Sequence, residues 1–276
     1  MNLIPVNEHE LEMSVRMFKH MFPRKDPYQK ILALKNYFLN WNIKKVVVGV
    51  SGGVDSALVL FLLAHIPEVE VHAVSIDFDT YHEVFDHGYV ELLQLATTRF
   101  RNVKWHKQDL TAAHTEMMIS LGLDKSDDEV YANTSYAMRY LGFFAYAQAL
   151  GGVTIGTTNL DELGYVGWFG KNSDMMVDIQ PISTLHKFEV IEWARLLGVP
   201  ERVAARVPTG DLINGTSDEE NFGCTYDELS FYSYHRLRDQ YMELSPFMEK
   251  HFEGVERLRK KNLHKYQGQR FNPIFL

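Results

Sequence analysis

Two adjacent glycines lie between serines in the segment Ser51-Gly52-Gly53-Val54-Asp55-Ser56. Glycines let successive backbone N–H groups turn toward one anion, and serine hydroxyls add further donors. A carboxylate such as that of Asp55 repels phosphates unless a cation lies between them, which points to Mg²⁺. The alternative is an ordinary strand-to-helix turn, in which Gly-Gly and Ser are also common. The segment predicts a site for nucleotide phosphates with a divalent metal beside them.

The elements around this segment are those that a phosphate site requires. Lys44–Val50 is a β-branched apolar run of strand length, and Ala57–His65 is an apolar segment of helical character. The glycines therefore lie at the carboxyl end of a strand and open a helix, where ligands and anions bind in open parallel sheets. Neither GxxxxGK[ST] nor GxGxxG occurs at this turn, which disfavours a Walker-type NTPase and an ordinary dinucleotide-binding Rossmann site.

Strands and helices alternate along the rest of the chain, which predicts a parallel sheet covered by helices on both faces. The chain contains no repeat, and no linker rich in Pro, Gly or Ser divides it. We expect one α/β domain over residues 1–276, a doubly wound, Rossmann-like parallel sheet with a helical N-terminal extension (1–43) and a core (44–265). Besides the first strand, we expect strands at 69–77, 103–106, 153–156 and 178–182, and helices at 89–100, 133–150 and 187–197.

Composition excludes several classes of protein. Lys and Arg total 28 against 36 Asp and Glu, for a net charge of -8. A protein that holds nucleic acid through its phosphates is usually basic, so we expect no nucleic-acid partner. The single cysteine, Cys224, forms neither an internal disulfide nor a Cys-rich zinc site, and we interpret it as a small buried apolar residue. The N-terminus lacks a signal pattern and no apolar stretch reaches the length of a membrane span, so we expect a cytoplasmic protein without a membrane partner.

The order of motifs resembles one family. Ser-Gly-Gly-x-Asp-Ser resembles the signature of the PP-loop ATP pyrophosphatases, which cleave ATP between its α and β phosphates. The segment 156–163 resembles the Gly-Thr-x-Asn-x-x-Glu motif of NAD synthetases, and the likeness runs from about Lys44 to His264. Further motifs follow in the family's order, namely Gly167–Lys171, Leu185-His186-Lys187, Pro208–Leu212, Ser217-Asp218-Glu219, Tyr226-Asp227-Glu228 and His264-Lys265.

The resemblance to the ammonia-dependent NAD synthetases implies an adenine-nucleotide hydrolase-like fold and a homodimer. It implies that ATP adenylates the nicotinate carboxylate of deamido-NAD (nicotinic acid adenine dinucleotide), with Mg²⁺ bound, and that ammonia then displaces AMP to give NAD. About 43 residues precede the first predicted strand and contain no cysteine, so we expect free ammonia rather than glutamine as the nitrogen source. Two alternatives stay open: an amide-forming relative acting on another carboxylate-bearing nucleotide, and a catalytically silent nucleotide-binding protein.

The resemblance also assigns roles to residues. Asp55, Glu162 and Lys187 are the expected catalytic residues, and Asp55 and Glu162 the expected metal ligands. Residues expected to bind ATP are Gly49, Val50, Ser51, Gly52, Gly53, Val54, Asp55, Ser56, Ser75, Thr157, Lys187 and Thr209. Residues expected to bind deamido-NAD are Asn133, Arg139, Lys171, Asp174, Asp178, His264 and Lys265.

The chain departs from the family pattern on the acceptor side. The helix that reads Asn-x-x-Ala-Arg-x-Arg in relatives runs from Asn133 to Arg139 here, and Ala137 takes the place of the arginine expected to contact deamido-NAD. The loop that is usually Gly-Asp-Gly-Gly is Ser173-Asp174-Met175-Met176, and one extra residue lies between Glu162 and Trp168. The predicted ATP side has no such departures.

Overall fold

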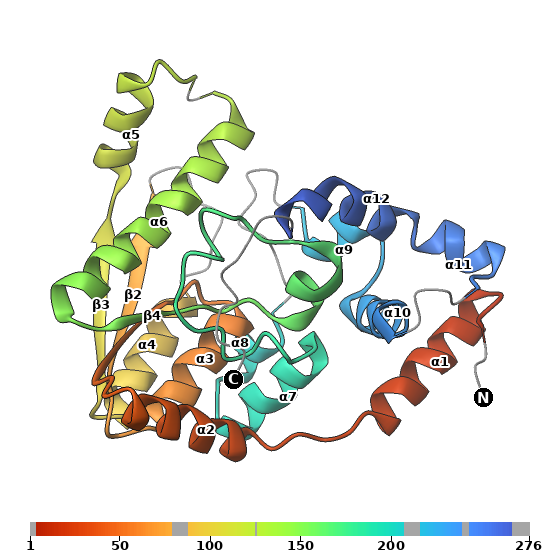
Figure 1. Cartoon of the computed structure of the whole chain (residues 1–276), viewed down its shortest axis with the longest axis horizontal. Helices are drawn as coiled ribbons and strands as arrows, with labels where there is room; N and C mark the ends of the chain where they lie inside the picture. Colours follow the sequence, from red (N-terminus) through yellow and green to blue (C-terminus); the bar gives the residue numbers. More distant parts are fainter. Residues whose placement is uncertain (1–3, 79–87, 125, 207–215, 239–242, 267–276) are drawn as a thin grey trace.

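A parallel sheet of four strands, at the left of Figure 1, forms the framework of the fold and confirms the predicted fold class. The computed structural model describes residues 4–78, 88–124, 126–206, 216–238 and 243–266. Within these residues the strand order is β3-β2-β1-β4, and Val46 of β1 lies opposite Val71 and Val153. The strands are β1 (Lys45–Gly49), β2 (Glu70–Asp77), β3 (Val103–Asp109) and β4 (Val153–Ile155).

Strand β1 is apolar on both of its faces. Val46 and Val48 contribute to the larger hydrophobic cluster, whereas Val47 packs with Val74 and Ile76 on the opposite face. Such an uninterrupted β-branched run is typical of a parallel strand covered on both sides. The burial of β1 fixes the position of the glycine-rich loop that follows it.

Helices cover both faces of the sheet. The long helix α6 (Asp128–Leu150) lies along one face and packs with α5 (Thr111–Ser120). The other face carries the larger hydrophobic cluster, to which α2 (Pro27–Asn40), α3 (Val54–Ala64), α4 (Gly88–Arg99), α7 (Lys187–Leu197) and α8 (Glu201–Ala204) contribute. In the described part of the chain, no helix combines the length and apolar character that crossing a membrane requires.

A second hydrophobic cluster lies beside the sheet and brings Leu11 and Val15 together with Phe252 and Val255. Helix α1 (Glu8–Met21) packs on α10 (Tyr226–Arg238) there, at the right of Figure 1, whereas α2 packs on α3. The first 43 residues therefore contribute to both clusters. The other elements of this region are η2 (a π-helical turn, Glu162–Val166), α9 (Asp218–Phe222), α10 (Tyr226–Arg238), α11 (Pro246–His251), α12 (Glu253–Asn262) and η3 (a 3₁₀ turn, Leu263–Lys265).

The prediction of a strand at 178–182 is wrong. Only one parallel bridge forms there, between Ile155 and Ile179. The Asp178 carboxylate accepts hydrogen bonds from the backbone N–H and the hydroxyl of Thr154, both at 2.7 Å. Pro181 lacks an N–H and cannot extend the ladder. A short apolar run therefore crosses the edge of the sheet without joining it as a strand.

Candidate active site

The glycine-rich loop between β1 and α3 is a tight turn closed by serine hydroxyls. The Ser51 and Ser56 hydroxyl oxygens lie 3.3 Å apart, and the Ser56 hydroxyl donates to the Gly53 carbonyl at 3.1 Å. Gly52 adopts a φ of 87°, in the left-handed region that glycine tolerates. The loop presents the first N–H groups of α3, which begins at Val54, to the carboxyl edge of the sheet.

Gly52→Ala should destabilise the fold by more than about 1 kcal/mol, because alanine is strained at this φ. A Cβ there would also lie 3.2 Å from the backbone nitrogen of Tyr89. Gly53→Ala is the matched control, since a Cβ at Gly53 meets only the Ser51 hydroxyl at 3.5 Å. Urea unfolding of the two variants measures the difference. Equal stabilities would contradict the requirement for glycine at position 52.

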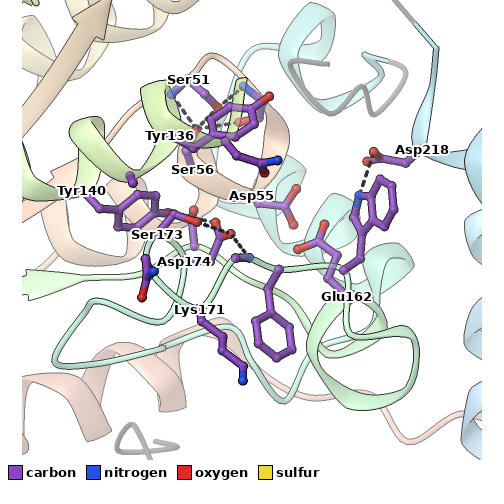
Figure 2. Close-up of a pocket in the computed structure, with 18 of the residues that line it drawn as sticks. Ser51, Asp55, Ser56, Tyr136, Tyr140, Glu162, Lys171, Ser173, Asp174 and Asp218 are labelled. Atoms are coloured by element: carbon purple, nitrogen blue, oxygen red, sulfur yellow. Dashed lines mark hydrogen bonds between the residues drawn. The ribbon is translucent and has the colours of Figure 1, made fainter. Parts of the chain in front are cut away.

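A cavity of about 770 Å³ opens at this edge of the sheet (Figure 2). Its volume lies within the range of small-molecule sites. Segments from widely separated parts of the chain line it: the loop after β1, helix α6, the chain from Thr157 to Asp174, and the starts of α7 and α9. The lining residues are Ser51, Gly53, Val54, Asp55, Ser56, Asn133, Thr134, Tyr136, Ala137, Tyr140, Thr157, Glu162, Trp168, Phe169, Gly170, Lys171, Asn172, Ser173, Asp174, Lys187, Arg206, Asp218, His264 and Lys265.

Two carboxylates and one ammonium group meet in this cavity. The Lys187 Nζ lies 2.5 Å from Asp55 Oδ2 and 3.6 Å from Glu162 Oε1. Burial and the neighbouring Asp55 raise the pKa of Glu162 to about 8, against the lowering effect of Lys187. Burial alone would lower the pKa of Lys187, but Asp55 and Glu162 outweigh it and raise that pKa. The site therefore favours cations beside its carboxylates.

Buried polar side chains position these three groups. Asn159 donates to Asp55 Oδ1 at 2.9 Å and accepts from the backbone N–H of Glu162 at 3.1 Å. The buried Asp161 accepts from the backbone N–H of Lys187 at 2.7 Å and pairs with His186 Nδ1 at 2.7 Å. The start of η2 is thus joined to the start of α7, so that Glu162 and Lys187 are held close to each other.

A third carboxylate, Asp218 at the start of α9, lines the same cavity. Its oxygens accept from Trp168 Nε1 at 3.1 Å and from the Tyr226 hydroxyl at 2.9 Å. The same hydroxyl lies 3.2 Å from Glu162 Oε1, and the Lys187 Nζ lies 4.6 Å from the centroid of the Tyr226 ring. In the described ranges, no cluster of three or more His, Cys, Asp or Glu side chains has the arrangement of a metal site. A metal here would need ligand oxygens from outside this set of residues.

The model of the NAD synthase family matches residues 28–268 of the chain. This chain belongs to the NAD synthase family. The resemblance seen in the sequence is therefore confirmed, and membership makes the chain an ATP-dependent, amide-forming ligase.

Two curated proteins similar to this chain are described as NH₃-dependent NAD⁺ synthetases. The NH₃-dependent NAD⁺ synthetase of Alkaliphilus oremlandii is 28% identical over 244 residues, which cover 84% of this chain and 90% of that protein. The NH₃-dependent NAD⁺ synthetase of Thermoplasma acidophilum is 31% identical over 188 residues, covering 67% of this chain and 74% of that protein.

Solved structures share the fold of this NAD synthase family member. The NMN synthetase from Francisella tularensis matches with a TM-score of 0.73 and 24% identity, over 91% of this chain and all of that chain. The NAD⁺ synthetase from Burkholderia pseudomallei matches with a TM-score of 0.67 and 24% identity, over 92% and 95% of the two chains. These likenesses establish the fold, and they leave the substrate open.

Most of the predicted site residues line this cavity. The expected metal ligands and Lys187 lie beside the glycine-rich loop, and the residues predicted for the acceptor lie toward α6 and η3. Lys265 donates to the carbonyls of Gly167 and Phe169, and Lys171 donates to that of His264. The predicted residues that line the cavity are Ser51, Gly53, Val54, Asp55, Ser56, Thr157, Glu162, Lys187, Asn133, Lys171, Asp174, His264 and Lys265.

Other predicted site residues do not line the cavity. Arg139 donates to the carbonyl of Ile76, and its guanidinium lies over Phe78. Ser75 is buried and accepts from Trp105. Asp178, Gly49, Val50 and Gly52 are likewise absent from the lining, and Thr209 lies outside the described residues.

Sequence reasoning gave no role to several lining residues, among them Tyr136, Tyr140, Trp168 and Asp218. Asp218 follows Ser217, which caps α9 together with Glu220. That Ser-x-x-Glu spacing predicts where the helix begins, but not that its first residue faces Glu162. The two tyrosines are four residues apart on α6, a spacing that predicts a shared helix face but not a cavity beside it.

Proposed function

We propose that the chain is an ammonia-dependent NAD synthetase, which converts deamido-NAD, ATP and ammonia to NAD, AMP and pyrophosphate. One observation carries the proposal: a single cavity holds both the glycine-rich loop with Asp55, Glu162 and Lys187, and a separate group of polar and aromatic side chains. ATP and a carboxylate-bearing acceptor would therefore share one space. The NH₃-dependent NAD⁺ synthetases among the relatives support the same acceptor and nitrogen source.

The first chemical step is transfer of AMP to the acceptor. A nicotinate carboxylate oxygen forms a bond to the α-phosphorus, and the bond from that phosphorus to pyrophosphate breaks. The backbone N–H groups of the loop and the Lys187 ammonium would stabilise the charge that grows on the departing pyrophosphate. Because a carboxylate is a poor acceptor for a nucleophile, the mixed anhydride with AMP supplies the leaving group that it lacks.

In the second step, ammonia attacks the carbonyl carbon of the anhydride, AMP leaves with the electron pair of the broken C–O bond, and the nitrogen loses one proton. Ammonium has no lone pair, so only neutral NH₃ serves as the nucleophile. Water would hydrolyse the same anhydride, so the site has to exclude it. Trp168 and Tyr226 place apolar rings around the carboxylates of Glu162 and Asp218, which reduces the room for water there.

The donor set fits Mg²⁺. Asp55 and Glu162 supply the hard carboxylate oxygens that Mg²⁺ selects, and phosphate oxygens of the nucleotide would complete its coordination. Burial raises the pKa of Glu162 first, and repulsion from Asp55 raises it further. A divalent cation would offset this repulsion. When bound, Mg²⁺ would neutralise charge on the phosphates during cleavage. Asp55 and Glu162 are the residues that would hold it.

A smaller acceptor is the second candidate. Ala137 lines the cavity where an arginine is expected to contact deamido-NAD, so one charge-assisted contact to a dinucleotide is missing. Such a contact is worth about 1.5–3 kcal/mol where it is well formed. The solved structures that share the fold include an NMN synthetase. A nicotinate mononucleotide, whose amide would be NMN, lacks the adenylate half of deamido-NAD and so offers fewer groups for such a contact.

An assay with ATP, Mg²⁺, ammonium and a panel of carboxylate acceptors tests the proposal. It measures kcat/KM for deamido-NAD and for nicotinic acid mononucleotide, together with AMP and pyrophosphate. A higher kcat/KM for deamido-NAD supports the first candidate, and Ala137→Arg should then lower its KM. A higher value for the mononucleotide establishes the second. ADP as the main nucleotide product would exclude both.

Ammonium should support turnover, and glutamine alone should not. At a fixed total concentration of ammonium, the rate should rise as the pH rises from neutral, because the fraction present as NH₃ rises. The measurement is the initial rate of AMP formation with either nitrogen source in ammonia-free buffer. Efficient use of glutamine by the purified chain would contradict this prediction.

We also propose that the chain forms a homodimer through α6. Leu141 and Phe144 are 54% and 46% exposed on this helix, while Ala147 is buried against the sheet. One side of α6 thus packs inside the subunit and another presents apolar side chains to solvent. Sedimentation of the wild-type chain and of Leu141→Glu tests the dimer, and a monomeric wild-type chain would exclude it.

A further inference from the structure

The Asp174 carboxylate is held by three hydrogen-bond donors. Its Oδ1 accepts from the Tyr140 hydroxyl at 2.8 Å. Its Oδ2 accepts from the backbone N–H of Gly170 at 2.8 Å and from the Ser173 hydroxyl at 3.2 Å. Two of the donors belong to the loop that contains Asp174, whereas Tyr140 comes from α6 (Figure 2). The carboxylate therefore fastens this loop to the helix.

The loop closes tightly around this carboxylate. A Cβ at Gly170 would come within 2.1 Å of the Ser173 hydroxyl, so a side chain there would displace one of the donors to Asp174. Gln180 Nε2 donates to the carbonyl of Asp174 at 2.8 Å and supports the loop from the other side. Burial, together with the adjacent Asp174, raises the pKa of Tyr140, so that its hydroxyl keeps its proton and remains a donor.

The same loop forms the acceptor end of the cavity. Gly170, Lys171, Ser173 and Asp174 all line it, and Tyr140 lines it from the side of α6. Tyr140 lies one helical turn beyond Tyr136, and Ala137 lies between them. Ala137 contributes no charge, so the position of the 170–174 loop, which carries Lys171, matters more for how the acceptor is held at this end.

We propose that Tyr140 is a positioning residue for the acceptor: its hydroxyl, acting through Asp174, holds the 170–174 loop in the shape that binds the carboxylate-bearing nucleotide. This inference rests on the proposed function for its kinetic consequence. Its structural part, the restraint of the loop by one hydroxyl, does not depend on which acceptor is used.

Tyr140→Phe removes only the hydroxyl and is the decisive variant. Amide hydrogen exchange of the free enzyme measures how often the loop opens, since the Gly170 N–H donates to Asp174 Oδ2. We expect exchange in the 167–176 segment to become about tenfold faster. The KM for the acceptor should rise about 10-fold, the value expected for a hydrogen bond to a charged group, while kcat and the KM for ATP stay within about twofold. In an Asp174→Asn background, Tyr140→Phe should add no further change.

Tyr146→Phe is the matched control. Tyr146 lies on the same helix, accepts from Gln108 at 2.6 Å, and does not line the cavity. It should alter neither loop exchange nor the acceptor KM. Unchanged exchange in Tyr140→Phe would overturn the restraint, and faster exchange with an unchanged acceptor KM would overturn the role in acceptor binding. Absence of wild-type turnover with every acceptor would instead refute the proposed function, and the exchange experiment would still decide whether the restraint exists.

Discussion

Asp55→Asn should lower the rate of AMP formation at least about 100-fold, the scale expected when one electrostatic contact to the transition state is lost. Asparagine keeps the shape of the side chain but removes the negative charge that pairs with Lys187 and that would bind Mg²⁺. Lys187 Nζ lies 2.5 Å from Asp55 Oδ2, and Asn159 donates to Oδ1 at 2.9 Å. An uncharged amide satisfies the lysine less well, and it is a poorer ligand for a hard cation.

Steady-state rates at increasing Mg²⁺ measure this effect. The variant should need more Mg²⁺ and still remain slow at saturation, while its unfolding transition stays cooperative. Asp227→Asn is the matched control, since Asp227 pairs with Lys19 on the surface. Normal turnover of Asp55→Asn at low Mg²⁺ would show that Asp55 neither binds the metal nor takes part in the reaction.

Lys187→Met should cost both activity and stability. Lys187 is 3% exposed and is the cation beside Asp55 and Glu162, so its loss leaves two buried carboxylates near each other. Removing one partner of a buried pair costs about 3–5 kcal/mol, and partial protonation of Glu162 would bring the loss toward the lower limit. We expect kcat to fall by about 10²–10³, because the ammonium that faces the departing pyrophosphate is gone.

A double variant separates the two effects. Asp55→Asn combined with Lys187→Met removes one of the two carboxylates that lost their cation and should recover part of the lost free energy of unfolding, measured in urea with EDTA present. It should not recover activity. Lys35→Met, which breaks only the exposed pair with Glu68, is the control for removal of a lysine. A fully stable and active Lys187→Met would contradict the role of this lysine.

The sequence predicted the parts of this site that depend on local pattern. The β-branched run of β1, the glycines after it and the apolar start of α3 follow one another without a gap, so the loop and its place on the sheet could be expected from spacing alone. The same holds for α7, whose apolar positions recur with helical period and which ends at Gly198 in the left-handed region.

Contacts between distant segments could not be predicted in this way. Asp161 and His186 are 25 residues apart, and no periodicity indicates that their side chains meet under Lys187. Tyr140 and Asp174 are 34 residues apart, on a helix and a loop that only the tertiary fold brings together. Asp178 was expected to face the acceptor, but its carboxylate binds Thr154 at the sheet edge. A short polar side chain in a loop often bonds to nearby backbone, and sequence alone does not reveal which partner it finds.

Transfer of a carboxylate oxygen to AMP tests most directly whether the acceptor carboxylate is adenylated. The acceptor is prepared with ¹⁸O in its nicotinate carboxylate and turned over with ATP, Mg²⁺ and ammonium. Because the carboxylate oxygen bonds to the α-phosphorus and then leaves with it, each AMP formed should carry one ¹⁸O, and pyrophosphate should carry none. Label in pyrophosphate, or AMP without label while the amide accumulates, would contradict an adenylated intermediate in this cavity.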